Sequence, residues 1–243
     1  MHTELSPLIP STVSKLINQT MARLQQLEVQ PDPIVPSQYR QRYGILTSAV
    51  RADGRILEAA IGAALNENPH LTVVRNPGVH IPPVVDQIIG SGASQEALRS
   101  SHFHYEPDVG RKITPDLVLL DTNRRAIDFI EIKRGLARTD AGKTRQTIRD
   151  LRCLRLVGRS YAAQAFGTEV DTVMAAVCSI HGASAVPGDL LVTVEDLERR
   201  YDVNLQAVIT ATYAEFAQRL SELLYQEEFK DDFLALGGNI GTL

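Results

Sequence analysis

The clearest strand pattern in the chain is a pair of apolar runs, LVLL and AIDFI, separated by the polar run TNRR. Short apolar runs that flank a turn predict a β-hairpin with buried strands. If the chain reverses at Asn123-Arg124, or around all four residues of TNRR, residues whose numbers sum to 247 face each other. Asp116 and Glu131 are such a pair. A turn of three or five residues would instead send them to opposite faces.

A period of 3.6 residues predicts amphipathic helices elsewhere in the chain. The predicted helices cover residues 11–28, 54–67, 142–166 and 204–229. The run VDTVMAAVCSIHG reads as a further buried strand, and residues 76–101, rich in Pro, Gly and Ser, read as a loop or small insertion. The order α-β-β-α-β-α predicts an α/β fold.

The hairpin is also where the sequence predicts chemistry. Directly opposed side chains have Cβ atoms ~5 Å apart, so the carboxylates of Asp116 and Glu131 would repel unless a cation compensated them. Lys133 lies two residues after Glu131 and therefore points to the same face. Mg²⁺ accepts oxygen ligands and keeps several waters. The pattern therefore predicts a magnesium site in which Lys133 orients a water or stabilises a phosphate.

A third carboxylate has the right surroundings for such a site. In GRILEAAIGAALNE, Glu58 shares one helical face with Ile61, Gly62 and Leu65. A carboxylate inside an apolar stripe is costly to bury without a partner. Glu58 could lie near the metal, or at the edge of the stripe where its tip reaches water or an arginine; we favour the metal.

Pro115-Asp116, a gap of fourteen residues and Glu131-Ile132-Lys133 resemble the motif of the PD-(D/E)XK nuclease superfamily. This resemblance implies a three-layer restriction-endonuclease-like core, in which helices flank a central mixed β-sheet. It implies Mg²⁺, with Mn²⁺ able to substitute, held by Asp116, Glu131 and Glu58. The Ile132 carbonyl would be a further ligand, and Lys133 would position the nucleophile.

Among members of this superfamily, a free-standing chain of this size most resembles a type II restriction endonuclease, which is usually a homodimer that cuts both DNA strands. Two alternatives stay open: a structure-selective repair or recombination nuclease, and a catalytically silent DNA-binding subunit of the same fold. We expect one domain, with an N-terminal helix and connection at 1–36, a catalytic core at 37–180 and a helical part at 181–243.

The predicted helix at 142–166, capped by Thr139 or Asp140, has one strongly basic face. That face comprises five arginines within an arc of ~120°: Arg145, Arg149, Arg152, Arg155 and Arg159. We expect them to contact the DNA backbone. Gln146 lies on the flank where a side chain could reach the cleft. RecB-like members carry a Gln here followed four residues later by a Tyr, whereas this chain has Asp150.

Charge is distributed unevenly along the chain. The whole chain has 25 basic and 29 acidic residues, but residues 124–159 hold 11 basic and four acidic ones, a balance of +7. The other 207 residues therefore carry −11. Arginine suits bidentate phosphate contacts. The alternative is a solvated helix face that pairs with residues 169–243, which have 13 acids and four bases.

The segment SHFHYEPD offers a competing metal site, because a strand would align His102, His104, Glu106 and Asp108. Pro107 weakens that strand, so we favour an exposed face or a wall of the nucleic-acid cleft. Cys153 and Cys178 form no disulfide or metal pattern and predict buried thiols of a reducing cytoplasm. We expect no signal peptide and no membrane span, and the chain contains no Walker, GxGxxG or GxSxG motif.

Overall fold

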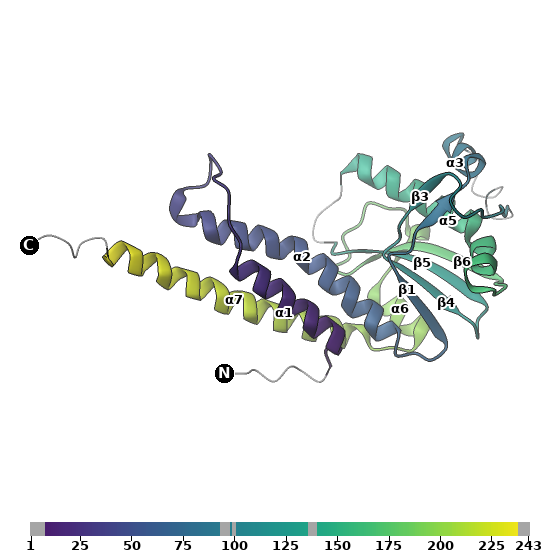
Figure 1. The fold of residues 1–243 in the computed structure, drawn as a ribbon. Coiled ribbons are helices and arrows are strands. Elements are labelled where there is room, and N and C mark those ends of the chain that lie inside the picture. The colour runs from purple at the N-terminus through teal and green to yellow at the C-terminus, as the bar shows by residue number, and fades with distance from the viewer. Residues whose placement is uncertain (1–7, 93–97, 99–100, 136–139, 238–243) are drawn as a thin grey trace, which may run out of the picture. The chain divides into compact units, whose positions relative to one another are not determined.

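The computed structural model describes residues 8–92, 98, 101–135 and 140–237, and the side chains as far as residue 226. The chain divides into two compact units (Figure 1). One unit joins residues 1–63 to residues 207–243, and the other comprises residues 64–206. These boundaries differ from the expected single domain with its core at 37–180, because both ends of the chain contribute helices to one separate core.

The helices and short 3-10 turns are α1 (Ser11–Gln25), η1 (Ser37–Tyr39), α2 (Arg40–Leu65), α3 (Pro83–Gly90), α5 (Ala141–Phe166), η2 (Gly188–Leu190), α6 (Val194–Tyr201) and α7 (Leu205–Gly237). The strands are β1 (Leu71–Arg75), β2 (Val79–Ile81), β3 (Arg111–Ile113), β4 (Leu117–Asp121), β5 (Ala126–Lys133), β6 (Thr172–Ser179) and β7 (Leu191–Val192). None of the described helices is long and apolar enough to cross a membrane.

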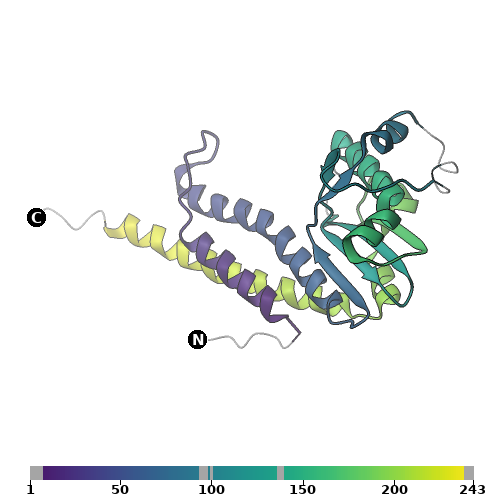
Figure 2. The ribbon, with the colours of Figure 1, turned by 45° about the vertical axis from the view of Figure 1, so that its right-hand side comes forward.

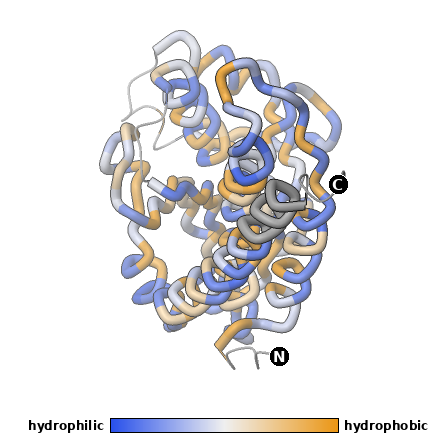
Figure 3. The backbone as a smooth tube through the Cα atoms, turned by 90° about the vertical axis from the view of Figure 1, so that its left-hand side faces the viewer, coloured by the Kyte–Doolittle hydropathy of each residue, from blue (hydrophilic) through white to orange (hydrophobic). Residues whose placement is uncertain are grey.

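The first unit is built from helices α1, α2 and α7, which lie side by side in two views (Figures 1 and 2). The apolar stripe predicted for α1 is buried, and Val13, Ile17 and Leu24 pack in one cluster with Ile45 of α2 and Phe216 of α7. Hydrophobic and hydrophilic stretches alternate along the helical turns (Figure 3), as expected of amphipathic helices.

The second unit contains a five-stranded mixed sheet in the order β1-β4-β5-β6-β7. Strands β1, β4 and β5 pair antiparallel, and β5, β6 and β7 pair parallel. Helix α5 packs on one face, where Leu154 and Val157 share a core with Ile127 and Phe129. Helix α6 reaches the opposite face, where Asp128 of β5 is fully buried. The predicted α/β class, a mixed sheet flanked by helices, is confirmed.

Local sequence explains where α5 begins and how closely it approaches the sheet. The Asp140 carboxylate caps it by accepting hydrogen bonds from the backbone N–H groups of Gly142 and Lys143. At Gly158 an added Cβ would lie 2.5 Å from a methyl carbon of Val173 and 3.0 Å from the ring of Phe129. A residue without a side chain is therefore required at this crossing.

Two expectations about irregular segments were wrong. Residues 76–101 contain β2, which pairs with β3 in a two-stranded sheet, and α3, which follows Pro82. These elements are too short to show a period in the sequence. Conversely, residues 101–106 form no strand. The Phe103 N–H donates to the Leu156 carbonyl of α5 (3.0 Å) and the Tyr105 N–H to the Ser160 hydroxyl (2.8 Å), so neither joins a ladder.

Candidate active site

The register of the β4–β5 hairpin is the one predicted from the sequence. Leu117 pairs with Ile130 and Asp121 with Ala126, so paired numbers sum to 247, and a four-residue turn joins the strands. The Asp121 carboxylate closes this turn by accepting the Arg124 N–H at 2.9 Å. Asp116 immediately precedes β4, and Glu131 follows Ile130. Asp116 and Glu131 lie one residue beyond the last pair of the ladder, where the β4–β5 backbone pairing has ended.

Asp116 is fixed to both neighbouring strands. Its Oδ2 accepts the backbone N–H of Ile132 at 2.6 Å, and its carbonyl accepts the N–H of Asn76, after β1, at 3.0 Å. The first contact holds the side chain against β5 beyond the end of the β4–β5 pairing. Asp116 is thereby held at the end of the hairpin next to the Glu131–Lys133 segment.

Glu131 and Lys133 lie on the face of the sheet covered by α5. Residues alternate between faces along a strand, and Ile127 and Phe129 of β5 pack with α5. Glu131 and Lys133 are spaced from Phe129 by two and four residues, so they point to the same face as Ile127 and Phe129. Within this pair, Lys133 Nζ lies 2.5 Å from Glu131 Oε1, and the side chains are 43% and 24% exposed. The lysine thus compensates the charge of Glu131, and both groups remain accessible to solvent.

A cavity of about 180 Å³ opens between the hairpin and α5. Pro115 and Glu131 line it from the sheet, and Thr147 and Asp150 line it from the helix. Lys133 borders an adjoining hollow of about 40 Å³, which Thr147 also lines. A substrate atom in this region would meet Glu131 from one side and α5 from the other.

Sequence reasoning missed an ionic network that joins α5 to α3 and β3. Arg111 donates to Asp150 at 2.7 Å and to Asp86 at 3.0 Å, and Arg149 reaches Asp86 at 2.8 Å. Burial raises the pKa of Asp86, but both arginines lower it by more, so it lies below its ordinary value of 3.8. The one sequence signal was Asp150 itself, at the position where RecB-like members carry Tyr. Gln146 is exposed and bonds to Asp150 at 2.7 Å.

The five predicted DNA-backbone arginines differ in their surroundings. Arg149 pairs with Asp86, Arg155 with Asp189 at 3.5 Å, and Arg159 donates to the Asp171 carbonyl. Asp171 and Asp189 belong to the acidic C-terminal third, so the alternative of pairing with that region holds for two of the five. The remaining two form no hydrogen bond or ion pair with any described residue: Arg145 and Arg152.

The donors at the hairpin fit a hard cation such as Mg²⁺. Two carboxylates with several retained waters satisfy magnesium. The Ile132 N–H donates toward Asp116, whereas the Lys133 carbonyl accepts from Ile180 on the β6 side at 3.0 Å. In a strand the N–H and C=O of one residue point to the same edge, and those of the next residue point to the opposite edge. The Ile132 carbonyl is therefore directed toward Asp116, as its N–H is. It is therefore oriented as the third oxygen donor.

The other candidate ligands are not gathered into a metal cluster. Within the described residues, no group of three or more His, Cys, Asp or Glu side chains is arranged to hold a metal ion. Glu58 is half-buried on α2 in the helical unit, and its role as a third ligand stays a prediction. His102, His104, Glu106 and Asp108 are all exposed, as we favoured, although not on a strand.

The two cysteines are buried free thiols, as predicted. Burial raises the pKa of each to about 12, and the nearby carboxylate of Asp86 adds to the effect at Cys153. Neither thiol is therefore a nucleophile at neutral pH.

Comparisons of the chain with protein-family models, with curated proteins and with solved structures found no match.

Proposed function

We propose that this protein is a Mg²⁺-dependent DNA endonuclease that hydrolyses phosphodiester bonds, with a restriction-endonuclease-like arrangement of its site. The observation that supports the proposal is the hairpin register, which brings Asp116 and Glu131 to the same end of the β4–β5 pairing, where Lys133 bonds to Glu131 and a cavity lies under arginine-rich α5. Acids that lie close together require compensation; Lys133 supplies it at Glu131 in this structure, and a bound cation would supply it for both carboxylates.

In this proposal each side chain has a defined role. Asp116 and Glu131, with the carbonyl of Ile132, would hold the metal, which acidifies a water and offsets charge on the scissile phosphate. Lys133 orients the attacking water and donates to a phosphate oxygen as negative charge develops. Since Lys133 pairs with Glu131 in this structure, binding of a cation by Glu131 would release its ammonium group for that task.

The basic segment 124–159 would bring the DNA backbone to the hairpin. Phosphate contacts position a duplex without reading its sequence, and arginine suits them. A homodimer would place two hairpins on the two strands of the duplex, which is the simplest way for one chain to make a double-strand cut. Sedimentation at the protein concentration of the cleavage assay would test this assembly.

The direct test is to incubate the protein with supercoiled, linear and single-stranded DNA, with and without Mg²⁺. We expect Mg²⁺-dependent cutting that is lost in Asp116→Asn and Lys133→Ala and retained in Lys15→Ala, a matched loss of one lysine from α1. Discrete plasmid fragments would indicate a restriction-type enzyme, whereas cutting confined to branched or end structures would indicate a structure-selective nuclease.

Two results would contradict the proposal. Full turnover in Asp116→Asn would remove the assigned metal ligand. DNA that is shifted in a gel but not cut under any divalent-metal condition would leave a silent DNA-binding subunit as the explanation.

A further inference from the structure

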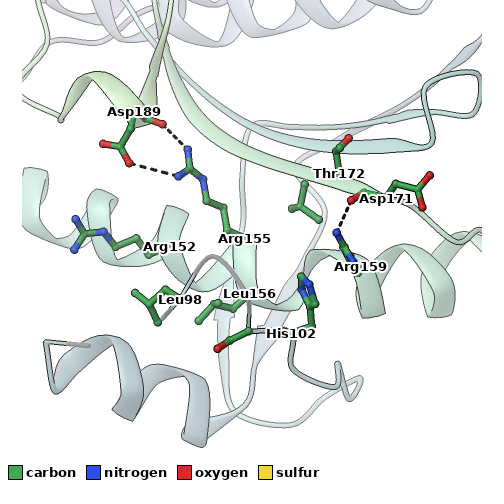
Figure 4. Close-up of a pocket in the computed structure, with 11 residues that line it drawn as sticks. Leu98, His102, Arg152, Arg155, Leu156, Arg159, Asp171, Thr172 and Asp189 are labelled. Carbon is green, nitrogen blue, oxygen red and sulfur yellow. Dashed lines mark hydrogen bonds and ion pairs between the residues drawn. The ribbon is translucent and has the colours of Figure 1, made fainter. Parts of the chain in front are cut away.

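A second cavity, of about 290 Å³, lies on α5 at a distance from Glu131 (Figure 4). It is bordered by α5, by the start of β6 and by Asp189 of η2. In the parallel β5–β6 register Thr172 pairs with Ala126, whereas Val177 pairs with Glu131. The cavity is therefore displaced from Glu131 by five residues of strand, or about 17 Å. Nothing in the proposed cleavage mechanism uses it.

Three arginines from one face of α5 line this cavity: Arg152, Arg155 and Arg159. Two of them are held in place, since Arg155 pairs with Asp189 and Arg159 donates to the carbonyl of Asp171. The carboxylate of Asp171 pairs instead with Arg125, at 2.8 Å. The cavity is thus partly ordered before any ligand binds, and the two carboxylates that also line it, those of Asp171 and Asp189, are paired with Arg125 and Arg155.

Arg152 differs from the other two because it has no partner among the residues that the structure describes. It is half-buried at the cavity wall, where its charge is less screened than on an open surface. Burial and the charge of Arg159 both lower the pKa of His102, which also lines the cavity. Arg152 is therefore an arginine of this cavity whose charge no described carboxylate offsets.

Part of the wall is apolar. Leu98, Leu156 and Val173 supply a hydrophobic surface beside the arginines. Pockets that hold small molecules commonly measure about 300–1,000 Å³ and combine such a surface with a few polar anchors. This cavity lies at the lower limit of that range, which suits a single nucleotide and is too small for a folded or duplex ligand.

We propose that this cavity binds a phosphomonoester joined to a nucleoside. Its phosphate would be bound by Arg152 and Arg159, and its base would lie on the surface formed by Leu156 and Val173. This chemistry has two sources, a free mononucleotide or the phosphorylated end of a DNA strand. The site does not depend on the hairpin cutting DNA. If the ligand is a chain end, the cavity would fix that end at ~17 Å from Glu131.

The test uses the full-length chain carrying Asp116→Asn, in buffer with EDTA, so that binding is measured separately from cleavage. Calorimetry would compare dAMP with deoxyadenosine. A fluorescent oligonucleotide would be compared with and without a 5′ phosphate, and likewise with and without a 3′ phosphate. We expect dAMP or one phosphorylated end to bind at least about tenfold more tightly than its unphosphorylated counterpart, the scale of one charge-assisted hydrogen bond.

The variant Arg152→Ala should abolish the preference for the phosphorylated ligand, and Arg145→Ala is its matched control. Both arginines lie on α5 and neither has a partner among the described residues, but only Arg152 lines the cavity. Both variants should keep the parental melting temperature. Preference lost in Arg152→Ala and kept in Arg145→Ala supports the site. Equal loss of the preference in both variants, or no preference for any phosphorylated ligand in the parent, overturns it.

Discussion

At the scale of single residues, the carboxylate of Asp116 links the fold to the proposed chemistry. It accepts the N–H of Ile132 just where the β4–β5 backbone pairing ends. That N–H belongs to a residue that is only 6% exposed, so its hydrogen bond contributes to stability. The same carboxylate is the first expected metal ligand. Stability and activity can therefore be separated at this position by the choice of substitution.

We predict that Asp116→Asn and Asp116→Ala both abolish cleavage but differ in stability. Asparagine keeps an oxygen that can accept the Ile132 N–H, whereas alanine leaves this donor without its acceptor at a cost of about 1–3 kcal/mol. Urea unfolding of both variants measures the difference. Equal stability of the two would show that the Asp116–Ile132 hydrogen bond contributes nothing.

Asp86 provides a prediction about pH. Its folded pKa lies below 3.8 because of Arg111 and Arg149, despite burial. A lowered carboxyl pKa adds stability that is complete above the unfolded value and is lost as the pH falls through the folded one. Asp86→Asn should therefore be less stable than the parent at neutral pH, and the gap should close below about pH 3.8. A gap that stays constant down to pH 2 would contradict this origin.

At the scale of elements, α5 serves as a scaffold and, in the proposed function, also as the binding surface. One side packs on the sheet, with Gly158 at the closest approach, and the other carries the arginines. The arginines are not equivalent, because Arg149 is paired with Asp86 and Arg145 is not paired with any described residue. Their contributions to folding and to DNA binding should therefore separate.

We predict that Arg145→Ala leaves stability within about 0.5 kcal/mol, because it breaks no contact in the described structure. It should also lower the log-affinity against log-salt slope for DNA by ~1, the contribution of one phosphate contact. By contrast, Arg149→Ala should cost about 0.5–1 kcal/mol, since its side chain is 41% exposed and its ion pair is partly screened. Thermal unfolding measures the stability of both variants, and salt titration of DNA binding measures their slopes. Identical effects of Arg145→Ala and Arg149→Ala would contradict the expected difference between the two arginines.

Helix α6 is fixed beneath the sheet by a buried polar contact. The Asp128 carboxylate accepts from Arg200 Nε at 2.5 Å and Nη2 at 3.0 Å, and from the Tyr201 hydroxyl. We predict a cost of about 3–5 kcal/mol for Asp128→Ala, which leaves Arg200 without its partner. Removing only the hydroxyl in Tyr201→Phe should cost about 1 kcal/mol. Chemical denaturation measures both, and a small loss in Asp128→Ala would mean that α6 is held by its apolar residues alone.

At the scale of the whole molecule, charge is segregated: residues 124–159 carry +7 and the rest of the chain −11. DNA should therefore be bound through the basic segment alone. If four phosphates are neutralised, affinity should fall by about 100-fold between 50 and 200 mM salt. Fluorescence anisotropy with a labelled duplex measures the slope. A salt-independent affinity would mean that contacts other than phosphate neutralisation hold the DNA.

Much of the candidate site was readable from the sequence because it is local. The turn TNRR fixes the register of the hairpin, so the pairing of residues 117–121 with residues 126–130 follows from counting. The start of α5 at Asp140 and the buried strand β6 are likewise set by neighbouring residues. Such features depend on turn length, capping and periodicity, which act within about ten residues.

Other features depend on segments far apart in the chain, and only the tertiary structure decided them. Arg149 meets Asp86, 63 residues away, and Tyr105 bonds to Ser160 in place of joining a strand. The five arginines of α5 look alike on a helical wheel. Three of them pair with distant segments and two do not: Arg149, Arg155 and Arg159 are paired, whereas Arg145 and Arg152 have no partner among the described residues. A wheel shows the face on which a side chain lies. What that side chain meets there is fixed by the packing of other elements against it.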